Sequence, residues 1–558
     1  MLHLIYLHIT FRSKRLAFLI VTLTILLFTG SKRHVFGADG YPRNHNIDIL
    51  SYHFSLLLQD ANDSISGIAT LEVKTKDKSL VQLSLDLVNV QDSPKGRGMY
   101  VDSIAAKVDH KLPLAFKHIN NKIKINLKQE IPANTYFELK IYYRGIPQDG
   151  LIISKNKFGN RTFFGDNWPN RARHWLPSVD HPYDKAYCNF TIEAPIHYEV
   201  IASGRKTEES FTLKNTKITK WESKAPLATK LMVIGVAGFA IQHLTTLEGT
   251  SIESWVFPEN KEAGFHDYAM APAIFDFFNS KIGPFAYAKL ANVQSKTRYG
   301  GMENASNIFY YENSVTGKRT IENLIAHEVA HQWFGDAVTE ADWNHVWLSE
   351  GFATYFTNVY VEHKYGVDSM NRLLNKQKSQ IAEYHKKAPQ SSIIDLKVSK
   401  LTDLLNTNTY QKGAWVLHML RKETGDDIFF EGIRKYYHNF KNSNALTKDF
   451  QFIMEEVSGK NLDWFFEQWL YWPELPSLKT NWKYNKRKQV LELTLTQTQV
   501  EKLFKYQLKV LFLTSTGERI YKDFSIDQKE HKFEIPLKNE PSEIIVDPLN
   551  TLLLYAVK

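Results

Sequence analysis

Two histidines and a glutamate have the residue types and the spacing of a catalytic metal site. His327 and His331 stand four positions apart in the segment His327-Glu328-Val329-Ala330-His331, so a helix would present both imidazoles on one face. Glu350 follows far enough along the chain for a turn and a second helix to return its carboxylate to the same place. Three such ligands leave a tetrahedral zinc ion with one open position for water, which is the catalytic pattern.

Glu328, beside the first histidine, is the candidate general base. Zinc bound by two histidines and a glutamate lowers the pKa of its water to about 7, and Glu328 is placed to take that proton and pass it to a leaving amine. The set predicts metal-assisted hydrolysis of an amide bond, with one zinc ion per chain. The alternative is a chance string on an ordinary helix, which the spacing of Glu350 disfavours.

The helix that carries the histidines has its own sequence signals. Thr320 is expected to cap its N-terminus, ahead of an apolar stripe of Ile321, Leu324 and Ile325. Gly335 is expected to end it as a C-terminal glycine.

Two further segments carry a resemblance to a known family. Gly300-Gly301-Met302-Glu303-Asn304 precedes the histidines, and Thr409-Tyr410-Gln411-Lys412-Gly413-Ala414-Trp415 follows them. With His327 to His331 and Glu350, these segments make the chain resemble the gluzincin aminopeptidases, the family of alanyl aminopeptidase and leukotriene A4 hydrolase. The resemblance covers nearly the whole chain from residue 38.

The resemblance implies roles that spacing alone does not supply. Residues Gly300, Gly301, Met302, Glu303 and Asn304 would form an edge strand that pairs with the substrate backbone, with Glu303 holding the free α-amino group. A carboxylate that pairs with an ammonium in a partly dry cleft binds a charged N-terminus more strongly than an internal peptide segment. Tyr410 would donate a hydrogen bond to the oxyanion of the tetrahedral intermediate. Without the resemblance, Glu303 is an acidic residue in a turn and Tyr410 one of 27 tyrosines.

One position departs from the family pattern. The segment from Arg171 to Pro182 resembles the approach to the cleft, and the family usually has a glutamine or glutamate nine positions before the proline that matches Pro177. Trp168 stands there. It is expected either to wall the first substrate pocket and favour aromatic or aliphatic residues, or to pack beneath the loop. Asp166 and Asn167 are the alternative groups that could reach the amine if the loop shifts.

The first 37 residues predict export. Arg12, Lys14 and Arg15 precede the uncharged stretch 16–28, which has the length of a signal sequence and is short for a membrane span. Val35-Phe36-Gly37 offers a cleavage site, so a periplasmic or secreted protein with no stable membrane span is expected. The alternative is an uncleaved signal anchor that tethers the chain to a membrane.

Charge and cysteine content exclude other classes. The leader holds five basic and no acidic residues, so the formal charge of +9 falls to +4 for residues 38–558. No basic cluster interleaved with aromatic residues indicates nucleic acid as a partner, and peptides with a free N-terminus are the expected partners. The single cysteine, Cys188, excludes an intramolecular disulfide and is predicted to be a buried strand residue.

The pattern of periodicity predicts a multidomain α+β chain, since about 520 residues exceed a single core. Short alternating segments predict β structure up to residue 242, helical periods dominate residues 268–472, and alternation returns in Val490–Leu495. We expect a signal peptide at 1–37, an N-terminal β saddle domain at 38–242, a thermolysin-like, mainly helical zinc catalytic domain at 243–476, and a small C-terminal β-sandwich at 477–558.

The sequence as a whole therefore predicts a zinc aminopeptidase that removes N-terminal residues from peptides. A thermolysin-type endopeptidase would share the zinc site, but it would cleave N-blocked peptides and tolerate Glu303→Ala. A non-catalytic peptide-binding protein would be favoured by loss of Glu328 or of a zinc ligand, and all of them are present.

Overall fold

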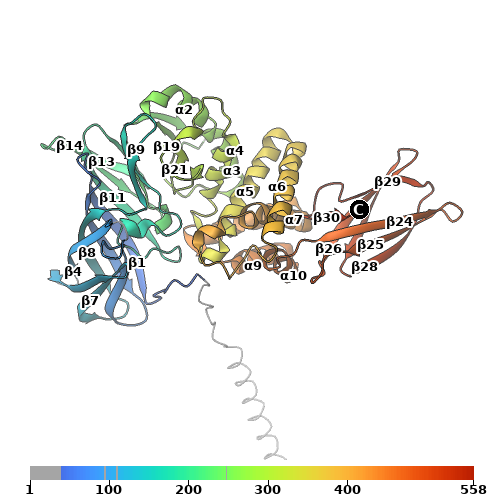
Figure 1. The fold of residues 1–558 in the computed structure, drawn as a ribbon, viewed down its shortest axis with the longest axis horizontal. Coiled ribbons are helices and arrows are strands. Elements are labelled where there is room, and N and C mark those ends of the chain that lie inside the picture. Colours follow the sequence, from blue (N-terminus) through green and yellow to red (C-terminus); the bar gives the residue numbers. More distant parts are fainter. Residues whose placement is uncertain (1–38, 94–95, 108–110, 247, 558) are drawn as a thin grey trace, which may run out of the picture.

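The computed structural model describes residues 39–557 apart from 94–95, 108–110 and 247. The predicted leader lies outside these residues. The described chain forms a β-rich N-terminal part, a helical middle and a pair of C-terminal sheets, which follow one another along the long axis (Figure 1). The predicted multidomain α+β fold is confirmed.

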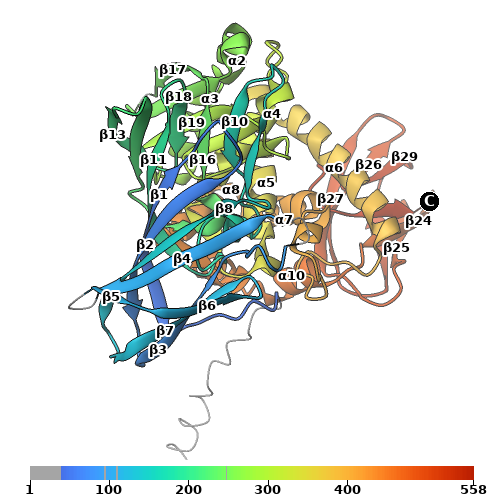
Figure 2. The same ribbon diagram turned by 60° about the vertical axis from the view of Figure 1, so that its left-hand side comes forward.

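A large sheet dominates the N-terminal part, and its long strands lie side by side in Figure 2. Residues of alternating burial build it, as in the strand that holds the fully buried Cys188. In order across the sheet the strands are β13 (Arg205–Phe211), β14 (Thr216–Glu222), β11 (Lys185–Pro195), β1 (Ile47–Leu57), β2 (Ile65–Thr75), β8 (Tyr136–Ile146), β4 (Gly98–Lys107) and β5 (Lys111–Pro113), with β15 (Leu227–Ala228) beside β11.

Two smaller sheets complete the N-terminal part. One has the order β12 (Glu199–Ala202), β16 (Ile234–Ala237), β10 (Arg161–Gly165) and β9 (Leu151–Lys155). The other has the order β3 (Leu80–Asp86), β7 (Lys122–Ile131) and β6 (Ala115–Ile119).

A five-stranded sheet opens the middle part. Its strands are β17 (Ala240–Thr245), β18 (Ser251–Val256), β19 (Lys289–Ser295), β21 (Asn307–Tyr311) and β20 (Gly301–Met302), in that spatial order. The central strand β19 is buried at every residue, as expected for a strand with both faces covered. The short β20 lies at the edge and pairs antiparallel with β21, so the segment Gly301–Met302 has one side of its backbone free of strand partners.

Helices make up the rest of the middle part. One of them, α5, is buried at every residue from Trp347 to Val361 and forms the centre of the domain. The helices are α2 (Lys261–Tyr268), α3 (Ala271–Ile282), α4 (Glu322–His331), α5 (Trp347–Tyr365), α6 (Val367–Lys387), α7 (Gly413–Thr424), α8 (Asp426–Phe440), α9 (Thr447–Ser458) and α10 (Asp463–Phe466).

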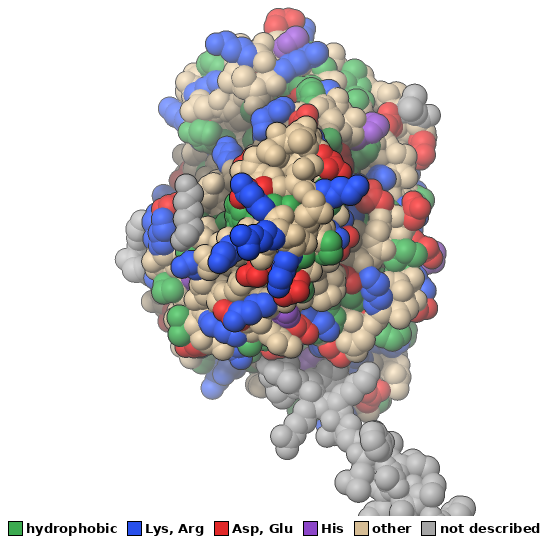
Figure 3. Space-filling view, turned by 90° about the vertical axis from the view of Figure 1, so that its right-hand side faces the viewer, with side chains coloured by type: hydrophobic (Ala, Val, Ile, Leu, Met, Phe, Trp, Pro, Cys, Tyr) green, Lys and Arg blue, Asp and Glu red, His purple; other side chains and the backbone are tan. Residues whose placement is uncertain are grey.

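The C-terminal part is a β-sandwich, because rings from its two sheets meet between them: Phe524 and Phe533 lie 4.5 Å apart between centroids. Basic side chains gather on the end of the molecule that Figure 3 shows, with acidic ones among them. One sheet has the order β28 (Glu530–Pro536), β25 (Val490–Gln497), β24 (Ser477–Asn485), β30 (Tyr555–Val557), and the other β27 (Arg519–Ile526), β26 (Tyr506–Thr514), β29 (Pro541–Val546).

The hydrogen-bonding pattern bears on where the domains divide. The expected boundary at 242/243 falls inside β17, which pairs with β18 of the middle part. We therefore propose that the first division lies between β16 and β17, near Gly238. We propose that the second lies at 476/477, where β24 begins.

Among the described residues, no helix combines the length and the apolar composition needed to cross a bilayer.

Two lysines of the N-terminal part contact the middle part. Lys230 donates to Glu340 at 2.6 Å, and both side chains are at most 1% exposed. Lys185, which is partly buried at the start of β11, donates to the carbonyl oxygens of Asp336 at 2.9 Å and Ala337 at 3.0 Å. These contacts fall on β22 (Val338–Glu340) and on the stretch that links it to α4, so the N-terminal part holds the chain directly after the candidate ligand helix.

Replacing Lys230 by methionine is expected to lower the free energy of unfolding by about 3–5 kcal/mol, because it leaves the Glu340 charge buried without a partner. Adding Glu340→Gln is expected to recover part of that loss. Lys386→Met removes an exposed ion pair with Glu383 and should leave stability unchanged. Denaturant unfolding of the three variants measures this, and equal midpoints for Lys230→Met and Lys386→Met would contradict it.

Candidate functional site

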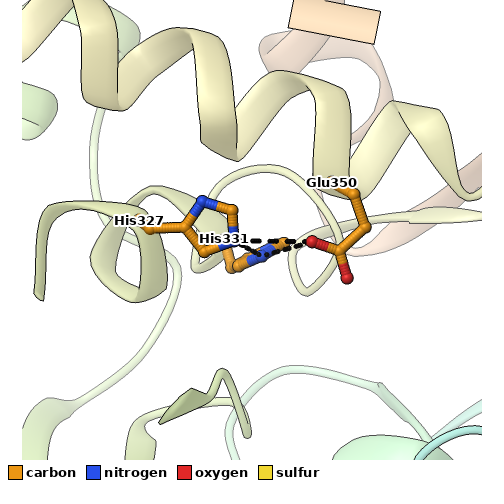
Figure 4. A group of neighbouring side chains, drawn as sticks. All are labelled: His327, His331 and Glu350. Atoms are coloured by element: carbon orange, nitrogen blue, oxygen red, sulfur yellow. Dashed lines mark hydrogen bonds and ion pairs between the residues drawn. The ribbon is translucent and has the colours of Figure 1, made fainter. Parts of the chain in front are cut away.

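Three donor atoms converge between α4 and α5. The Nε2 atoms of His327 and His331 lie 3.1 Å apart, and Glu350 Oε2 lies 3.4 Å from the first and 3.2 Å from the second. Figure 4 shows the two rings and the carboxylate turned toward one another. Ligand atoms of a tetrahedral zinc ion, each about 2.0–2.1 Å from the metal, lie about 3.3 Å from one another. The triangle therefore has the size of one face of such a site.

The helix α4 presents both histidines because four residues make slightly more than one turn. Its ends differ from the expectations. The helix begins at Glu322 with Ile321 in the cap position and no side-chain cap, so the Thr320 prediction is wrong. It ends at His331, and Gly335 lies beyond it with a φ of +112°. Gly335 therefore belongs to the turn that follows the helix and does not end the helix.

Backbone and hydroxyl groups orient the second histidine. His331 Nδ1 lies 3.1 Å from the carbonyl oxygen of Phe334 and 3.0 Å from Ser349 Oγ. A carbonyl only accepts, so Nδ1 carries the proton and the lone pair of Nε2 faces the triangle. Gly335 is required here, since a Cβ on it would lie 2.2 Å from Ser349 Oγ.

The charges of the site favour a cation. Burial alone would lower the pKa of His331, but the carboxylates of Glu350, Glu303 and Glu328 raise it to about 10. Burial would raise the pKa of Glu350, yet His331 and His327 bring it far below its usual value. Burial is also the main reason why the pKa of Glu328 lies well above the ordinary range. The carboxylates thus stabilise positive charge at the position of the two rings.

A second set of possible ligand atoms shares one residue with the first. Glu303, Glu328 and His331 offer atoms that lie within 4.8 Å of one another, as do those of His327, His331 and Glu350. The second set has only one nitrogen and uses the same ring. The first set is the better metal site because its interatomic distances of 3.1–3.4 Å match a tetrahedral face, which leaves Glu303 and Glu328 as carboxylates beside the metal position.

Gly301 makes room for Glu328. A Cβ built on Gly301 would lie 2.2 Å from Glu328 Oε1 and 2.4 Å from its Cδ. The side chain of Glu328 therefore packs directly against the backbone of Gly301. The edge strand β20 and the carboxylate beside the first histidine are thereby held against each other.

Glu303 follows β20 directly and is buried with 4% exposure. Its Oε1 has no hydrogen-bond partner among the described residues, and its backbone oxygen accepts from Gln332 Nε2 at 2.6 Å. Both polar side-chain atoms of the fully buried Asn304 are likewise without a partner in the described chain. A free buried carboxylate oxygen next to the metal position is the arrangement that a bound ammonium would satisfy.

Tyr410 reaches the site from the opposite side. It lies on η7 (Asn408–Lys412), a π-helical turn that continues into α7, and its ring stacks on His327 with centroids 6.0 Å apart. The approach depends on two glycines, because a Cβ on Gly351 would lie 3.1 Å from the Cα of Gly413. Burial and then the charge of Glu350 raise the pKa of Tyr410 well above its usual value, so the phenol keeps its proton.

Two family profiles match this chain. The Peptidase M1 N-terminal domain matches residues 48–231, and the Peptidase family M1 domain matches residues 267–469. The chain belongs to peptidase family M1. The second match contains the ligand triangle, Glu303, Glu328 and Tyr410, and the resemblance inferred from the sequence is confirmed.

Several M1 relatives align with more than half of the chain. Glutamyl aminopeptidase of Rattus norvegicus is 27% identical over 336 residues, which are 57% of this chain and 35% of the rat protein. Aminopeptidase N of Homo sapiens is 28% identical over 315 residues, which are 52% of this chain and 32% of the human protein. Probable aminopeptidase 2 of Sulfurisphaera tokodaii is 26% identical over 354 residues, which are 60% of this chain and 44% of the Sulfurisphaera protein. The matched part of this chain spans less than half the length of each relative.

A solved structure has the same fold. Aminopeptidase A of Legionella pneumophila, crystallised in complex with aspartic acid, superposes with a TM-score of 0.79 over 94% of this chain and 61% of its own. The sequence identity is 18%, so the likeness concerns the fold.

Trp168 is the position where the sequence departs from the M1 pattern, and the structure resolves the alternatives. Its indole borders the cavity at the ligand triangle, although it is only 2% exposed. Asp166 is bound to Arg171, and Asn167 donates to the carbonyl oxygens of residues 229 and 232. Neither side chain borders the cavity, so the loop does not shift to offer them.

Sequence reasoning missed the groups that support the M1 site. Ser349, Gly351 and Gly413 each make a contact that depends on how two helices cross. Their nearness to Glu350 and Tyr410 in the sequence was the available signal, since small residues beside functional ones mark close packing. Lys230 had no such signal, because its partner Glu340 lies 110 positions away.

Gly301→Ala is expected to lower the free energy of unfolding by about 1–3 kcal/mol, because the new methyl group overlaps the Glu328 carboxylate. Gly300→Ala is the matched control, since the nearest atom to its Cβ is Leu324 Cδ1 at 4.0 Å. It should leave stability unchanged. Denaturant midpoints of the two variants test the contact, and equal losses would contradict it.

Proposed function

We propose that this chain is a zinc-dependent aminopeptidase that hydrolyses the N-terminal peptide bond of peptides. One observation carries the proposal: a free buried carboxylate, Glu303, lies beside a set of donor atoms, His327, His331 and Glu350, with the size of a zinc face. The first feature selects a free amine and the second provides the metal. An exopeptidase needs both in one cavity.

His327, His331 and Glu350 would hold one zinc ion per chain, and their nitrogen and carboxylate donors suit that metal. Zinc held there would lower the pKa of a water molecule and polarise a peptide carbonyl. The bond between His331 Nδ1 and the Phe334 carbonyl supports the role, because in the neutral ring it directs the lone pair of Nε2 toward the metal position.

The substrate backbone would pair with β20. This strand lies at a sheet edge, and edge strands are templates for adding an extended peptide. Glu303 follows the strand, so a peptide paired there would bring its ammonium to this carboxylate. Residues 300–304 therefore act as the binding segment, with Glu303 as its amine anchor.

Glu328 would act as the general base. Burial raises the pKa of this carboxyl well above its ordinary value, which makes it a better proton acceptor than an exposed glutamate. Gly301 holds it against the strand that binds the peptide. It would take a proton from the attacking water and deliver it to the leaving nitrogen.

Tyr410 would stabilise the oxyanion. Its phenol stays protonated because burial and Glu350 raise its pKa, so it donates a hydrogen bond where negative charge develops. Its stack on His327 supports this placement.

We also propose that the protein is exported. The basic residues before an uncharged stretch at 16–28 support this, and a membrane-tethered form is the alternative. Among the relatives described above, only the name of the rat protein specifies a residue, so the names do not supply the preferred N-terminal residue of this chain.

Removal of zinc by a chelator is expected to abolish cleavage of free aminoacyl amides, and added zinc to restore it. N-acetylated amides are expected to resist cleavage, because they offer no ammonium to Glu303. Glu303→Ala should reduce kcat/KM for free-amine substrates by about 10²-fold or more while the bound zinc stays near one per chain. A fluorogenic amide panel and metal analysis measure these effects.

The matched control for Glu303→Ala is Glu383→Ala, at an exposed position of α6, which should leave kcat/KM unchanged. Equal cleavage of acetylated and free substrates would favour the endopeptidase. No cleavage by zinc-loaded protein would favour a peptide-binding protein.

Tyr410→Phe is expected to reduce kcat by about 10²–10³-fold with a small change in KM, because the lost hydrogen bond acts on the transition state. Tyr521→Phe, at an exposed position of β27, is the control and should change neither constant. Steady-state kinetics on one free aminoacyl amide compare the two. A rise in KM with unchanged kcat would assign Tyr410 to substrate binding instead.

A further inference from the structure

The cavity at the ligand triangle has one polar and one apolar wall. The polar wall consists of the ligands, Glu303, Glu328 and Tyr410. The apolar wall consists of Trp168, Tyr299, Met302 and Leu405. Trp168 comes from the N-terminal part, whereas Tyr299, Met302 and Leu405 belong to the middle part, and all four lie in or against one hydrophobic cluster that joins the two parts.

Trp168 is the fixed centre of the apolar wall. Its ring meets Tyr299 edge to face at 6.2 Å and Trp343 at 5.6 Å between centroids. Its backbone oxygen accepts from Arg171 Nε at 2.7 Å. A ring held by two aromatic neighbours offers a rigid apolar surface that loses little entropy when a ligand covers it.

Glu303 is the group left to bind the substrate amine, because the polar residues next to Trp168 already have hydrogen-bond partners within the protein. The Asp166 carboxylate accepts from Arg171 and from the backbone nitrogen of Arg298, and Asn167 Oδ1 accepts from Trp175 Nε1 at 2.9 Å. An indole N–H is a donor only and cannot accept from an ammonium. The Trp168 position therefore faces the part of the substrate that is not the amine.

The cavity offers no partner for an acidic substrate side chain. Among its lining residues, all within the described chain, there is no lysine or arginine. Lys230 is the lysine whose charge acts on Glu303, but it is 1% exposed and bonded to Glu340. A substrate carboxylate here would lie near Glu303 and Glu328 without a counter-ion, which costs free energy.

We propose that Trp168 determines specificity: the first side chain of the substrate packs on its indole, and the site selects peptides with a large apolar N-terminal residue and rejects an acidic one. The inference rests on the proposed aminopeptidase function and names the substrate class of that site. Trp168 contacts the side chain, while Glu303 holds the amine that every substrate shares.

The test is kcat/KM for leucyl, phenylalanyl, alanyl, arginyl and glutamyl fluorogenic amides with the zinc-loaded full chain. Leucyl and phenylalanyl amides are expected to exceed the glutamyl amide by about 100-fold or more. Trp168→Ala is expected to lower kcat/KM for leucyl and phenylalanyl amides by about 10- to 100-fold and for the alanyl amide by less than about threefold. Trp482→Ala removes an exposed tryptophan of β24 and should change no ratio.

Two further variants test the proposal if Trp168→Ala fails to fold. Trp168→Phe retains an apolar ring and is expected to keep the order of substrates, whereas Trp168→Gln is expected to lose the leucyl preference over alanyl. Zinc content and unfolding midpoints show that each variant is intact.

The outcomes separate the inference from the proposed function. Chelator-sensitive cleavage of the alanyl amide tests the function by itself, and its absence overturns both proposals. With that cleavage present, a glutamyl or arginyl amide cleaved as fast as the leucyl amide overturns the inference alone. So does a Trp168→Gln variant with an unchanged leucyl to alanyl ratio.

Discussion

The close approach of three donor atoms from α4 and α5, two of them on buried side chains, is the constraint on which the middle of the molecule depends. Two imidazole nitrogens and a carboxylate oxygen lie within 3.1–3.4 Å of one another. Side chains held this close and this dry need a shared positive charge to be stable. The surrounding contacts serve to keep these atoms in place. Phe334 and Ser349 orient one ring, and Gly335 leaves room for that contact.

The same constraint explains why glycines stand where the elements cross. Gly301 admits the Glu328 carboxylate to the edge strand, and the contact between Gly351 and Gly413 brings Tyr410 to the site. Each of these glycines lies next to, or within three residues of, a group proposed to act on the substrate. Close packing and chemistry are therefore linked through backbone that carries no side chain. The N-terminal part contributes Lys185 and Lys230, which contact the chain after α4, and Trp168, which borders the cavity.

Much of the fold followed from periodicity. Alternation in β1, β8 and β25 and helical periods in α9 identified the β, helical and β order, because burial on one face imposes the period of each element. The start of α4 was predicted wrongly, because the helix begins at Glu322 rather than after Thr320. The expected division at 242/243 falls inside β17, which pairs with β18. A local pattern contains no information about those partners.

The sequence by itself indicated the chemistry of the candidate site. The spacing of His327 and His331 and the later Glu350 predict a metal site, because helix geometry converts spacing into direction. The motifs around Glu303 and Tyr410 carry the resemblance to family M1. Only the tertiary structure decided which groups share the cavity. It brought Trp168 to the ligands and bound Asp166 and Asn167 elsewhere. Burial and competition for hydrogen-bond partners depend on residues far apart in the chain, so the final shape and charge of the cavity emerge only when the parts pack together.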